Sequence, residues 1–372
     1  MLKLAIKFLL FDKAKSFGAL MGIVISIFLV GQQSGIFLFL TGNMSKIADK
    51  ADADIWVVDN RTTDVNSLGR IDMRLGRQIE SIRGVKRAYP LVIAGATLRV
   101  PNGNPGSLQL IGSEPPAFVG GPTDFVKGGL SDLLADGGVT VDVFDKPALS
   151  GAGYGSVIEL GGQRATVAAA TRGLRGFGGL LSFTTIDRAR ALGKFPTTEV
   201  SAFLLRLEKD TSAERTCARI NNSIYGIHAW TKKDFSKASV KSVLARSGIA
   251  MSIGTLVVFA IISGLFIIGL TLYSSAVDRI RDYGTLKAIG APNSYITRLI
   301  LTQAALLGFF GYILGSLLLQ AFKNGIANAG VLFEYPLWLR IAFFVGTMVI
   351  SLSGAMFAVR RITKVEPASV FR

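Results

Sequence analysis

Cysteine and histidine, the side chains that most often bind metals or carry nucleophilic catalysis, each occur only once, as Cys217 and His228. One residue of each type cannot form a Cys/His zinc site, an iron–sulfur cluster or a disulfide within the chain. Cys217 falls on an apolar helical stripe with Ile220 and Ile224, a pattern typical of a buried thiol. His228 lies beside Trp230 in a predicted strand, with no evident partner. The sequence therefore indicates neither a catalytic site nor a metal site.

A nucleotide site would need a glycine-rich loop that presents backbone N–H groups to phosphate. The run from Gly151 to Gly155 has three glycines, but it follows no clear strand and opens no helix, so we interpret it as a turn. The P-loop pattern G-x-x-x-x-G-K-[ST] does not occur; Gly193-Lys194 lacks both the earlier glycine and the following Ser or Thr. We therefore expect no cofactor in this chain.

The apolar residues are clustered, and this clustering decides the class of protein. Half of the residues are apolar and 18% are charged, whereas a soluble domain usually has about 25% charged residues. A helix that crosses hydrocarbon needs roughly 20 apolar residues. Four segments meet that requirement, and we predict transmembrane helices at 17–41, 248–275, 299–322 and 337–359. The first is expected to stay uncleaved, because its apolar stretch is longer than that of a signal peptide.

The predicted spans have no ionisable residue in their central parts, although ion-coupled transport usually requires one. The most polar membrane residues are Gln32, Gln33 and Ser34, in the outer part of the first span. They could form a helix–helix hydrogen bond, or a polar patch that faces a cavity or lipid headgroups.

Glycines recur in the spans at the spacing that lets two helix backbones approach closely in lipid. Four helices are too few to enclose a substrate route and still move, so we expect these glycine-lined surfaces to pack against a second copy of the chain or a related partner. The glycines are Gly18, Gly22, Gly31, Gly35, Gly308, Gly311 and Gly315.

Lysine and arginine in the short flanks of the spans predict the orientation of the chain. Twelve basic residues lie in 1–16, 276–298 and 360–372, whereas the short loop 323–336 has only Lys323, against Glu334. The three basic segments, and so both termini, are therefore expected in the cytoplasm. The segment 42–247 would lie outside it, since so long a segment translocates whatever its charge.

That outer segment has the pattern of a folded α+β domain. Apolar residues Ile71, Leu75, Ile79 and Ile82 have helical spacing and end at Gly84, a predicted C-cap. A second helix carries Cys217 and is expected to start after an N-cap at Asp210 or Thr211, and 42–50 and 232–246 are expected to form a helical stalk. Strand-like runs fall at 53–58, 92–100, 107–111, 139–143, 156–160, 165–170 and 200–207.

The most informative short segment is Asp278 to Pro292, in the predicted cytoplasmic loop. Residues 276–289 can form a short helix with Leu286 and Ile289 on one side, ended by Gly290. This segment resembles the hallmark of FtsX/MacB-type ABC permeases, R-x-R-E-x-x-x-L-x-A-x-G-A. The matching residues are Arg279, Arg281, Asp282, Leu286, Ala288, Gly290 and Ala291, with Asp282 where the family usually has Glu.

The resemblance covers essentially the whole chain. Segment 1–16 is similar to the amphipathic helix that leads into the family's first span, and 360–372, with Arg360-Arg361-Ile362 and Val365-Glu366-Pro367-Ala368, is similar to its C-terminal tail. The implied fold is an integral membrane α-helical protein with four transmembrane helices. A large extracytoplasmic α+β domain, the MacB-like periplasmic core, would stand on the stalk. The implied location is the bacterial inner membrane.

The resemblance also implies a function, that of a non-catalytic permease subunit with a DevC-like layout. A separate cytoplasmic ATPase of the LolD/DevA type would bind ATP and Mg. Its motion would pass to the outer domain, a mechanism called mechanotransmission, and drive export or extraction of an amphiphilic substrate. Further implied partners are a second copy or a paralogue, a periplasmic membrane-fusion adaptor, an outer-membrane channel and membrane lipid, but no nucleic acid. The implied coupling residues are Arg279, Arg281, Asp282, Leu286, Lys287, Ile289 and Gly290.

Two alternatives stay open. The chain could be an FtsX-like signalling subunit that activates a periplasmic cell-wall hydrolase and transports nothing. It could also be a membrane-anchored binding module or lipid-handling enzyme, although no convergent acid, base or nucleophile supports catalysis. The sequence does not name the cargo: lipid, glycolipid, lipoprotein, peptide and drug all fit.

Overall fold

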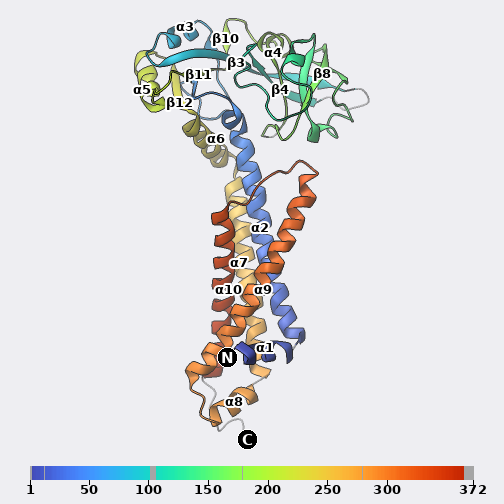
Figure 1. Ribbon diagram of the computed structural model, residues 1–372, viewed down its shortest axis with the longest axis vertical. Helices are drawn as coiled ribbons and strands as arrows, with labels where there is room; N and C mark the ends of the chain where they lie inside the picture. The colour runs from blue at the N-terminus through green and yellow to red at the C-terminus, as the bar shows by residue number, and fades with distance from the viewer. Residues whose placement is uncertain (1, 12, 101–105, 178, 279, 364–372) are drawn as a thin grey trace. The chain divides into compact units, whose positions relative to one another are not determined.

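The computed structural model describes residues 2–11, 13–100, 106–177, 179–278 and 280–363. The chain divides into two compact units. Unit 1 comprises Met1–Leu38 and Ile249–Arg372, and unit 2 comprises Phe39–Gly248. Figure 1 shows unit 1 as a helical bundle and unit 2 as a sheet domain with short helices.

Four described helices are long and apolar enough to cross a membrane, as predicted. They are α2 (Lys13–Lys50), α7 (Ile249–Asp278), α9 (Asn293–Ala327) and α10 (Leu337–Thr363), and two shorter helices, α1 (Leu2–Phe11) and α8 (Ile280–Ala288), complete unit 1. Helix α9 extends beyond the predicted span at both ends. Helix α2 belongs to unit 1 as far as Leu38 and continues unbroken into unit 2.

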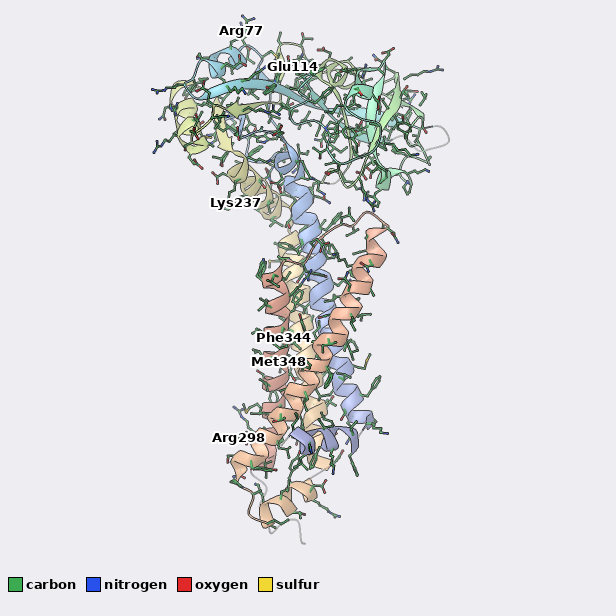
Figure 2. All side chains as sticks on the ribbon, viewed as in Figure 1. Arg77, Glu114, Lys237, Arg298, Phe344 and Met348 are labelled. Atoms are coloured by element: carbon green, nitrogen blue, oxygen red, sulfur yellow. The ribbon has the colours of Figure 1, made fainter. Side chains whose placement is uncertain are left out.

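Most of the predicted glycine-lined surfaces are covered by side chains of this same chain. A Cβ added at Gly311 would collide with Ile23, and one at Gly315 would lie 3.0 Å from Ile27, so α9 packs directly on α2. On the other side of α9, Met348 of α10 (Figure 2) would lie 3.2 Å from a Cβ at Gly308. The remaining contacts are Gly22 with Ile267, Gly31 with Leu319, and Gly35 with Phe333 and Tyr335; at Gly18 there is open space.

These contacts correct one expectation. The glycines do allow close helix packing, but six of the seven do so within the chain, and they give no evidence for a second copy. Two hydrogen bonds reinforce the same packing. Ser351 Oγ of α10 donates to the carbonyl of Ala304 in α9 at 2.6 Å. Tyr335 Oη donates to the carbonyl of Gly31 in α2 at 2.8 Å.

Unit 2 is built on a sheet of ten described strands, mostly antiparallel. The long strand β3 (Val85–Arg99) joins its two parts, because it pairs with β11 along its first half and with β4 and β7 further on. The strands are β1 (Ile55–Asp59), β3, β4 (Gly106–Ser113), β5 (Phe125–Lys127), β6 (Gly138–Asp142), β7 (Val157–Leu160), β8 (Gln163–Thr171), β9 (Leu180–Thr185), β11 (Ala202–Leu207) and β12 (Ile227–Thr231). A separate pair consists of β2 (Ile71–Asp72) and β10 (Glu199–Val200).

Apolar residues on both faces of the sheet make the core. In β1, Ile55 and Val57 belong to one buried cluster, while Trp56 and Val58 belong to the other. This alternation follows from the two-residue period of a strand. The helices α3 (Leu75–Glu80), α4 (Ile186–Gly193), α5 (Ala213–Ser223) and α6 (Lys232–Ser247) complete the unit.

The structure corrects several local predictions in unit 2. The expected helix over 71–82 is shorter, because Ile71 pairs with Val200 as a strand and α3 starts at Leu75. The N-cap of α5 is neither Asp210 nor Thr211 but Ser212, whose Oγ accepts from the N–H of Arg215 at 3.3 Å. Strand β9 and helix α4 were not predicted. Residues 101–105 lie outside the described residues.

Candidate functional site

The segment predicted to contact an ATPase forms a short helix, α8, between α7 and α9. Gly290 follows it with a φ of 100°. The N–H of Gly290 donates to the carbonyl of Lys287 at 3.0 Å, and that of Ala291 to the carbonyl of Leu286 at 2.9 Å. These two bonds make a Schellman motif, which requires positive φ at the glycine. The predicted C-cap is therefore confirmed, and α9 begins directly after Pro292.

One side of α8 packs on the bundle of unit 1. Tyr283 is 2% exposed, and its ring centre lies 5.7 Å from that of Phe8 in α1. Leu286, half-buried, packs against the same apolar cluster, which includes Ala5 of α1. Sequence reasoning singled out neither Phe8 nor Tyr283. The three-residue spacing of Ala5 and Phe8, and of Tyr283 and Leu286, was the signal that could have found this contact.

The opposite side of α8 faces outward. Ile289 is 81% exposed, and Arg281 and Asp282 are exposed as well. The expectation that Leu286 and Ile289 form one apolar contact side is wrong, because Leu286 points into the bundle and Ile289 lies past the last turn of α8. Arg279 lies outside the described residues. The exposed residues of the segment are therefore Arg281, Asp282, Thr285, Ala288, Ile289 and Gly290.

The polar patch in α2 does not link helices within the described residues. Gln32, Gln33 and Ser34 are all half-buried. Ser34 Oγ donates to the carbonyl of Val30 at 2.8 Å, so its hydroxyl is satisfied by its own helix. Neither glutamine has a hydrogen-bond partner in the described part of the chain. The described residues therefore show no helix–helix hydrogen bond from this patch, and its exposure to a cavity or headgroups stays a prediction.

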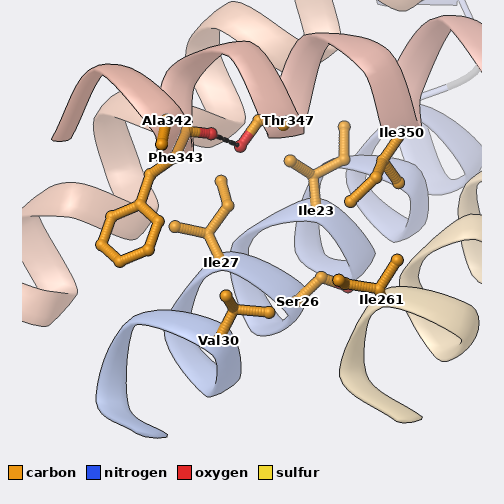
Figure 3. A pocket seen from close by; sticks show the side chains of 10 residues that line it. Ile23, Ser26, Ile27, Val30, Ile261, Ala342, Phe343, Thr347 and Ile350 are labelled. Atoms are coloured by element: carbon orange, nitrogen blue, oxygen red, sulfur yellow. Dashed lines mark hydrogen bonds between the residues drawn. The ribbon is translucent and has the colours of Figure 1, made fainter. Parts of the chain in front are cut away.

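A small apolar cavity of about 160 Å³ lies between α2, α7 and α10 (Figure 3). Its two hydroxyl groups are both used. Ser26 Oγ donates to the carbonyl of Gly22 at 2.8 Å, and Thr347 Oγ1 donates to the carbonyl of Phe343 at 2.7 Å. The cavity thus offers no free polar group to an ion or a polar substrate.

The other candidate chemical groups are inert in their surroundings. Burial, with smaller contributions from Glu214 and Asp234, raises the pKa of Cys217 to about 12, so the thiol stays protonated. Burial also lowers the pKa of His228, whose ring lies 4.5 Å from that of Trp230. The described residues contain no group of three or more His, Cys, Asp or Glu side chains that could hold a metal.

The glycine-rich run 151–155 is a turn, as predicted. The N–H groups of Gly151, Ala152 and Gly155 donate to backbone carbonyls, and that of Gly153 donates to Ser156 Oγ at 3.1 Å. These donors are therefore not free to hold a phosphate group.

Residues 254–367 match the family model described as the C-terminal region of FtsX-like permeases. This part of the chain is therefore similar to the C-terminal region of FtsX-like permeases. The matched range includes most of α7 and the whole of α8, α9 and α10, with the Schellman motif at Gly290 about a third of the way along it. The family resemblance predicted from residues 278–292 is confirmed. The tail residues 364–372 lie outside the described residues.

Two curated relatives extend the comparison. The chain is 28% identical over 120 residues to an uncharacterized ABC transporter permease found in two strains of Mycobacterium tuberculosis. The match covers 32% of this chain and 34% of the relative, so the chain spans about a third of the length of the curated relatives it matches.

Two solved structures resemble part of the chain. The extracellular domain of the ABC-type transporter YknZ from Gram-positive bacteria is 14% identical, with a TM-score of 0.35, and the match covers 48% of this chain and 99% of that domain. The periplasmic region of MacB from Actinobacillus actinomycetemcomitans is 10% identical, with a TM-score of 0.38, and the match covers 54% and 99%. At such low TM-scores neither likeness identifies the fold.

Proposed function

We propose that this chain is the permease subunit of an ABC transporter whose separate cytoplasmic ATPase drives movements of unit 2. Those movements would export or extract an amphiphilic substrate, with a periplasmic adaptor and an outer-membrane channel completing the route. In this proposal ATP and Mg are bound by the ATPase, both termini are cytoplasmic, and unit 2 is periplasmic. The proposal is supported by the FtsX-like match and by the relatives that are named ABC transporter permeases.

The observation that carries the proposal is the way α8 is held. Its inner side packs through Tyr283 and Leu286 on the bundle, and its end is fixed by the Schellman motif at Gly290. A helix can pass on a displacement only if it does not move independently of its support. The remaining outer face, with Ile289 exposed among charges, has the composition of a contact site with an apolar anchor and a polar rim.

One further contact and one continuous helix would carry a displacement from this region into the spans. Lys15, near the start of α2, forms an ion pair with Asp278, the last residue of α7. Helix α2 then runs without interruption to Lys50. No proline interrupts α2, so its backbone hydrogen bonds can continue along the whole helix. Helix α2 is therefore the element through which unit 2 would be driven.

Within unit 2 the end of α2 is attached to both parts of the sheet domain. Lys46 Nζ donates to the carbonyl of Gly173 at 2.9 Å, and Lys50 pairs with Asp124 at 2.6 Å. The carbonyl of Met44 accepts from Asn66 Nδ2 at 2.7 Å. The carbonyl of Ala51, next to the helix end, accepts from Lys232 Nζ at 2.8 Å. A displacement of α2 would thus reach the loops beside β8 as well as α6.

The lining of the small cavity favours a substrate route outside the bundle. Its walls are apolar and its hydroxyls are used, and the central parts of the spans have no ionisable residue. A polar headgroup could not cross such a bundle without a large desolvation cost. This favours movement of the substrate by unit 2 over passage between the helices.

The test is reconstitution of the chain with its ATPase in lipid vesicles. We expect ATP hydrolysis to depend on the permease, and an amphiphilic cargo to leave the membrane only when ATP is hydrolysed. Hydrolysis that depends on the permease with no release of any amphiphile would favour the signalling alternative. Hydrolysis indifferent to the permease would contradict the proposal.

A further inference from the structure

Unit 2 has a cavity of about 340 Å³ where β5, β6 and β8 meet the glycine-rich turn. This volume falls in the range of small-molecule pockets, roughly 300–1,000 Å³. The cavity lies entirely within unit 2 and is separate from the coupling segment. The residues that shape it are Val126, Lys127, Val143, Lys146, Tyr154 and Ala170.

Apolar side chains that reach water line this cavity. Val126 is 50% exposed, Val143 is 37% exposed and Tyr154 is 52% exposed. A single exposed apolar residue is ordinary, but several around one cavity indicate a surface that a ligand covers. Covering them would remove apolar area from water, which is favourable. The lining therefore suits a ligand with an apolar body.

Two lysines at the edge of the cavity, Lys127 and Lys146, are exposed. In the described part of the chain neither forms an ion pair with a carboxylate. Lys127 Nζ lies 5.9 Å from the ring centre of Tyr154, so this amine stands beside the apolar lining. A ligand with a negative group could therefore contact both amines while its apolar body stays in the cavity.

The nearby carboxylates do not compete for these lysines. Asp142 is 1% exposed, and its oxygens accept from the N–H groups of Phe144 at 3.1 Å and Leu174 at 2.8 Å. Asp145 pairs with Arg175 at 2.7 Å. Both carboxylates are thus buried and already bonded. The free charge at the edge of the cavity is positive.

We propose that this cavity binds a small anionic amphiphile, with its chain against Val126 and Val143 and its negative group at Lys127 and Lys146. The turn 151–155 contributes shape and not phosphate ligands, because the N–H groups of Gly151, Ala152, Gly153 and Gly155 are already bonded. The interpretation of this cavity as a site that holds cargo in unit 2 rests on the proposed function. Binding itself requires no ATPase, so it can be tested separately.

The experiment uses the full chain in nanodiscs of neutral phosphatidylcholine and a photoreactive octanoate that carries a diazirine. After irradiation, cross-linked peptides are mapped by mass spectrometry. We expect cross-links within residues 126–156, competed by octanoate but not by octyl glucoside, which has the same chain without the charge. Stronger competition by a short-chain phosphatidylglycerol would assign the ligand to phospholipids, and competition by octanoate alone would assign it to free fatty acids.

Two double variants test the role of the lysines. Lys127→Glu with Lys146→Glu should lower the cross-linking yield about tenfold, the scale expected when two surface charge contacts become repulsive. Lys209→Glu with Lys241→Glu makes the same charge change on exposed lysines elsewhere in unit 2 and should leave the yield unchanged. Val143→Asp should lower the yield while both lysines remain.

Equal cross-linking in the two double variants would overturn the proposal. So would equal competition by octyl glucoside, or labelling confined to the helices of unit 1. If the chain binds octanoate in this cavity but never releases cargo with ATP, the result would support the binding site and contradict the proposed function.

Discussion

The ring of Phe8 in α1 lies 5.7 Å from the ring of Tyr283 in α8, at a tilt of 45°. This contact joins the first helix of the chain to the short helix that precedes α9. Tyr283 is buried by it, whereas Ile289, six residues further on, is 81% exposed. Substitutions on the buried side of α8 should therefore change the stability of the chain, whereas substitution of Ile289 should change its association with a partner.

Ile289→Asp should leave the fold intact and release the ATPase, because it places a charge in the predicted apolar anchor of the contact. Loss of such an anchor typically costs at least about 2 kcal/mol of binding. Leu286→Asp should instead lower the thermal stability of the chain itself, because it places a charge in the bundle. Thermal unfolding and co-purification of the ATPase separate the two effects. Tyr225→Asp, at a 99% exposed position in unit 2, is the control. If all three variants have the same thermal stability and the same co-purification of the ATPase, the roles assigned to Ile289 and Leu286 are refuted.

Gly290→Val should weaken the docking of α8. Valine is strained at a φ of 100°, with a cost of roughly 1–3 kcal/mol, and the two bonds of the Schellman motif would be lost first. Gly290→Asn should be milder, because asparagine tolerates positive φ better. Hydrogen exchange of residues 285–291 measures the effect. Unchanged protection in the valine variant would show that the motif does not hold the helix end.

The predicted orientation can be tested with single cysteines in a Cys217→Ser background. Tyr225→Cys should react with a membrane-impermeant thiol reagent in intact spheroplasts, and Thr285→Cys should react only after lysis. Both positions are exposed. Ser113 would be a poor reporter, because it is fully buried. Labelling of Thr285→Cys in sealed spheroplasts would reverse the assigned topology.

The isolated chain should neither bind nor hydrolyse ATP. It has no P-loop, and the donors of its glycine-rich turn are bonded internally. Equilibrium dialysis of the purified chain with labelled ATP is the measurement, with the chain and its ATPase together as the positive control. Saturable binding to the chain alone would contradict the separate-ATPase proposal.

The stability of unit 2 should depend on pH through Asp145. Burial raises the pKa of this carboxyl from 3.8 to about 6, although Arg175 acts in the opposite direction. Between those pH values the folded protein holds the proton and the unfolded chain does not, so stability falls as pH rises from about 4 to about 6 and then levels off. The full change is on the order of 3 kcal/mol.

Asp145→Asn should flatten this pH dependence, as measured by thermal unfolding between pH 4 and 7. Asp136→Asn, which changes an exposed carboxyl of the same unit, should keep it. If the wild-type protein becomes more stable from pH 4 to pH 6, and the stability of Asp145→Asn changes with pH in the same way, this carboxyl does not control the effect.

The parts of the structure that were predicted well depend on local constraints. A membrane span needs a long apolar run, so the four long helices could be recognised directly from sequence. Gly290 could be recognised as a C-cap because glycine is the residue that adopts positive φ without strain. In both cases the required residues are neighbours in the sequence.

The parts that were missed depend on distant partners. Ile71 has helical spacing with Leu75, yet it forms a strand because Val200 supplies the pairing. Helical spacing also grouped Leu286 with Ile289, but the position of Phe8 decides which side of α8 is buried. The cavity edge formed by Lys127 and Lys146 was not foreseen because it arises where a strand and a turn meet. The pattern of residues in a single sequence does not show which distant residues come into contact.

The pairing of β1 has a consequence for synthesis of the chain. This strand is the first of unit 2 to be made, but its neighbours in the sheet are β11 and β12, with Ile55 opposite both Leu205 and Thr231. Until the ribosome has passed Leu207, neither edge of β1 has a partner for its backbone N–H and C=O groups, and the edge that pairs with β12 has none until Thr231, even though α2 is already complete. Unpaired strands of this kind aggregate readily. The newly made chain should therefore need protection by a chaperone for most of the time in which unit 2 is produced.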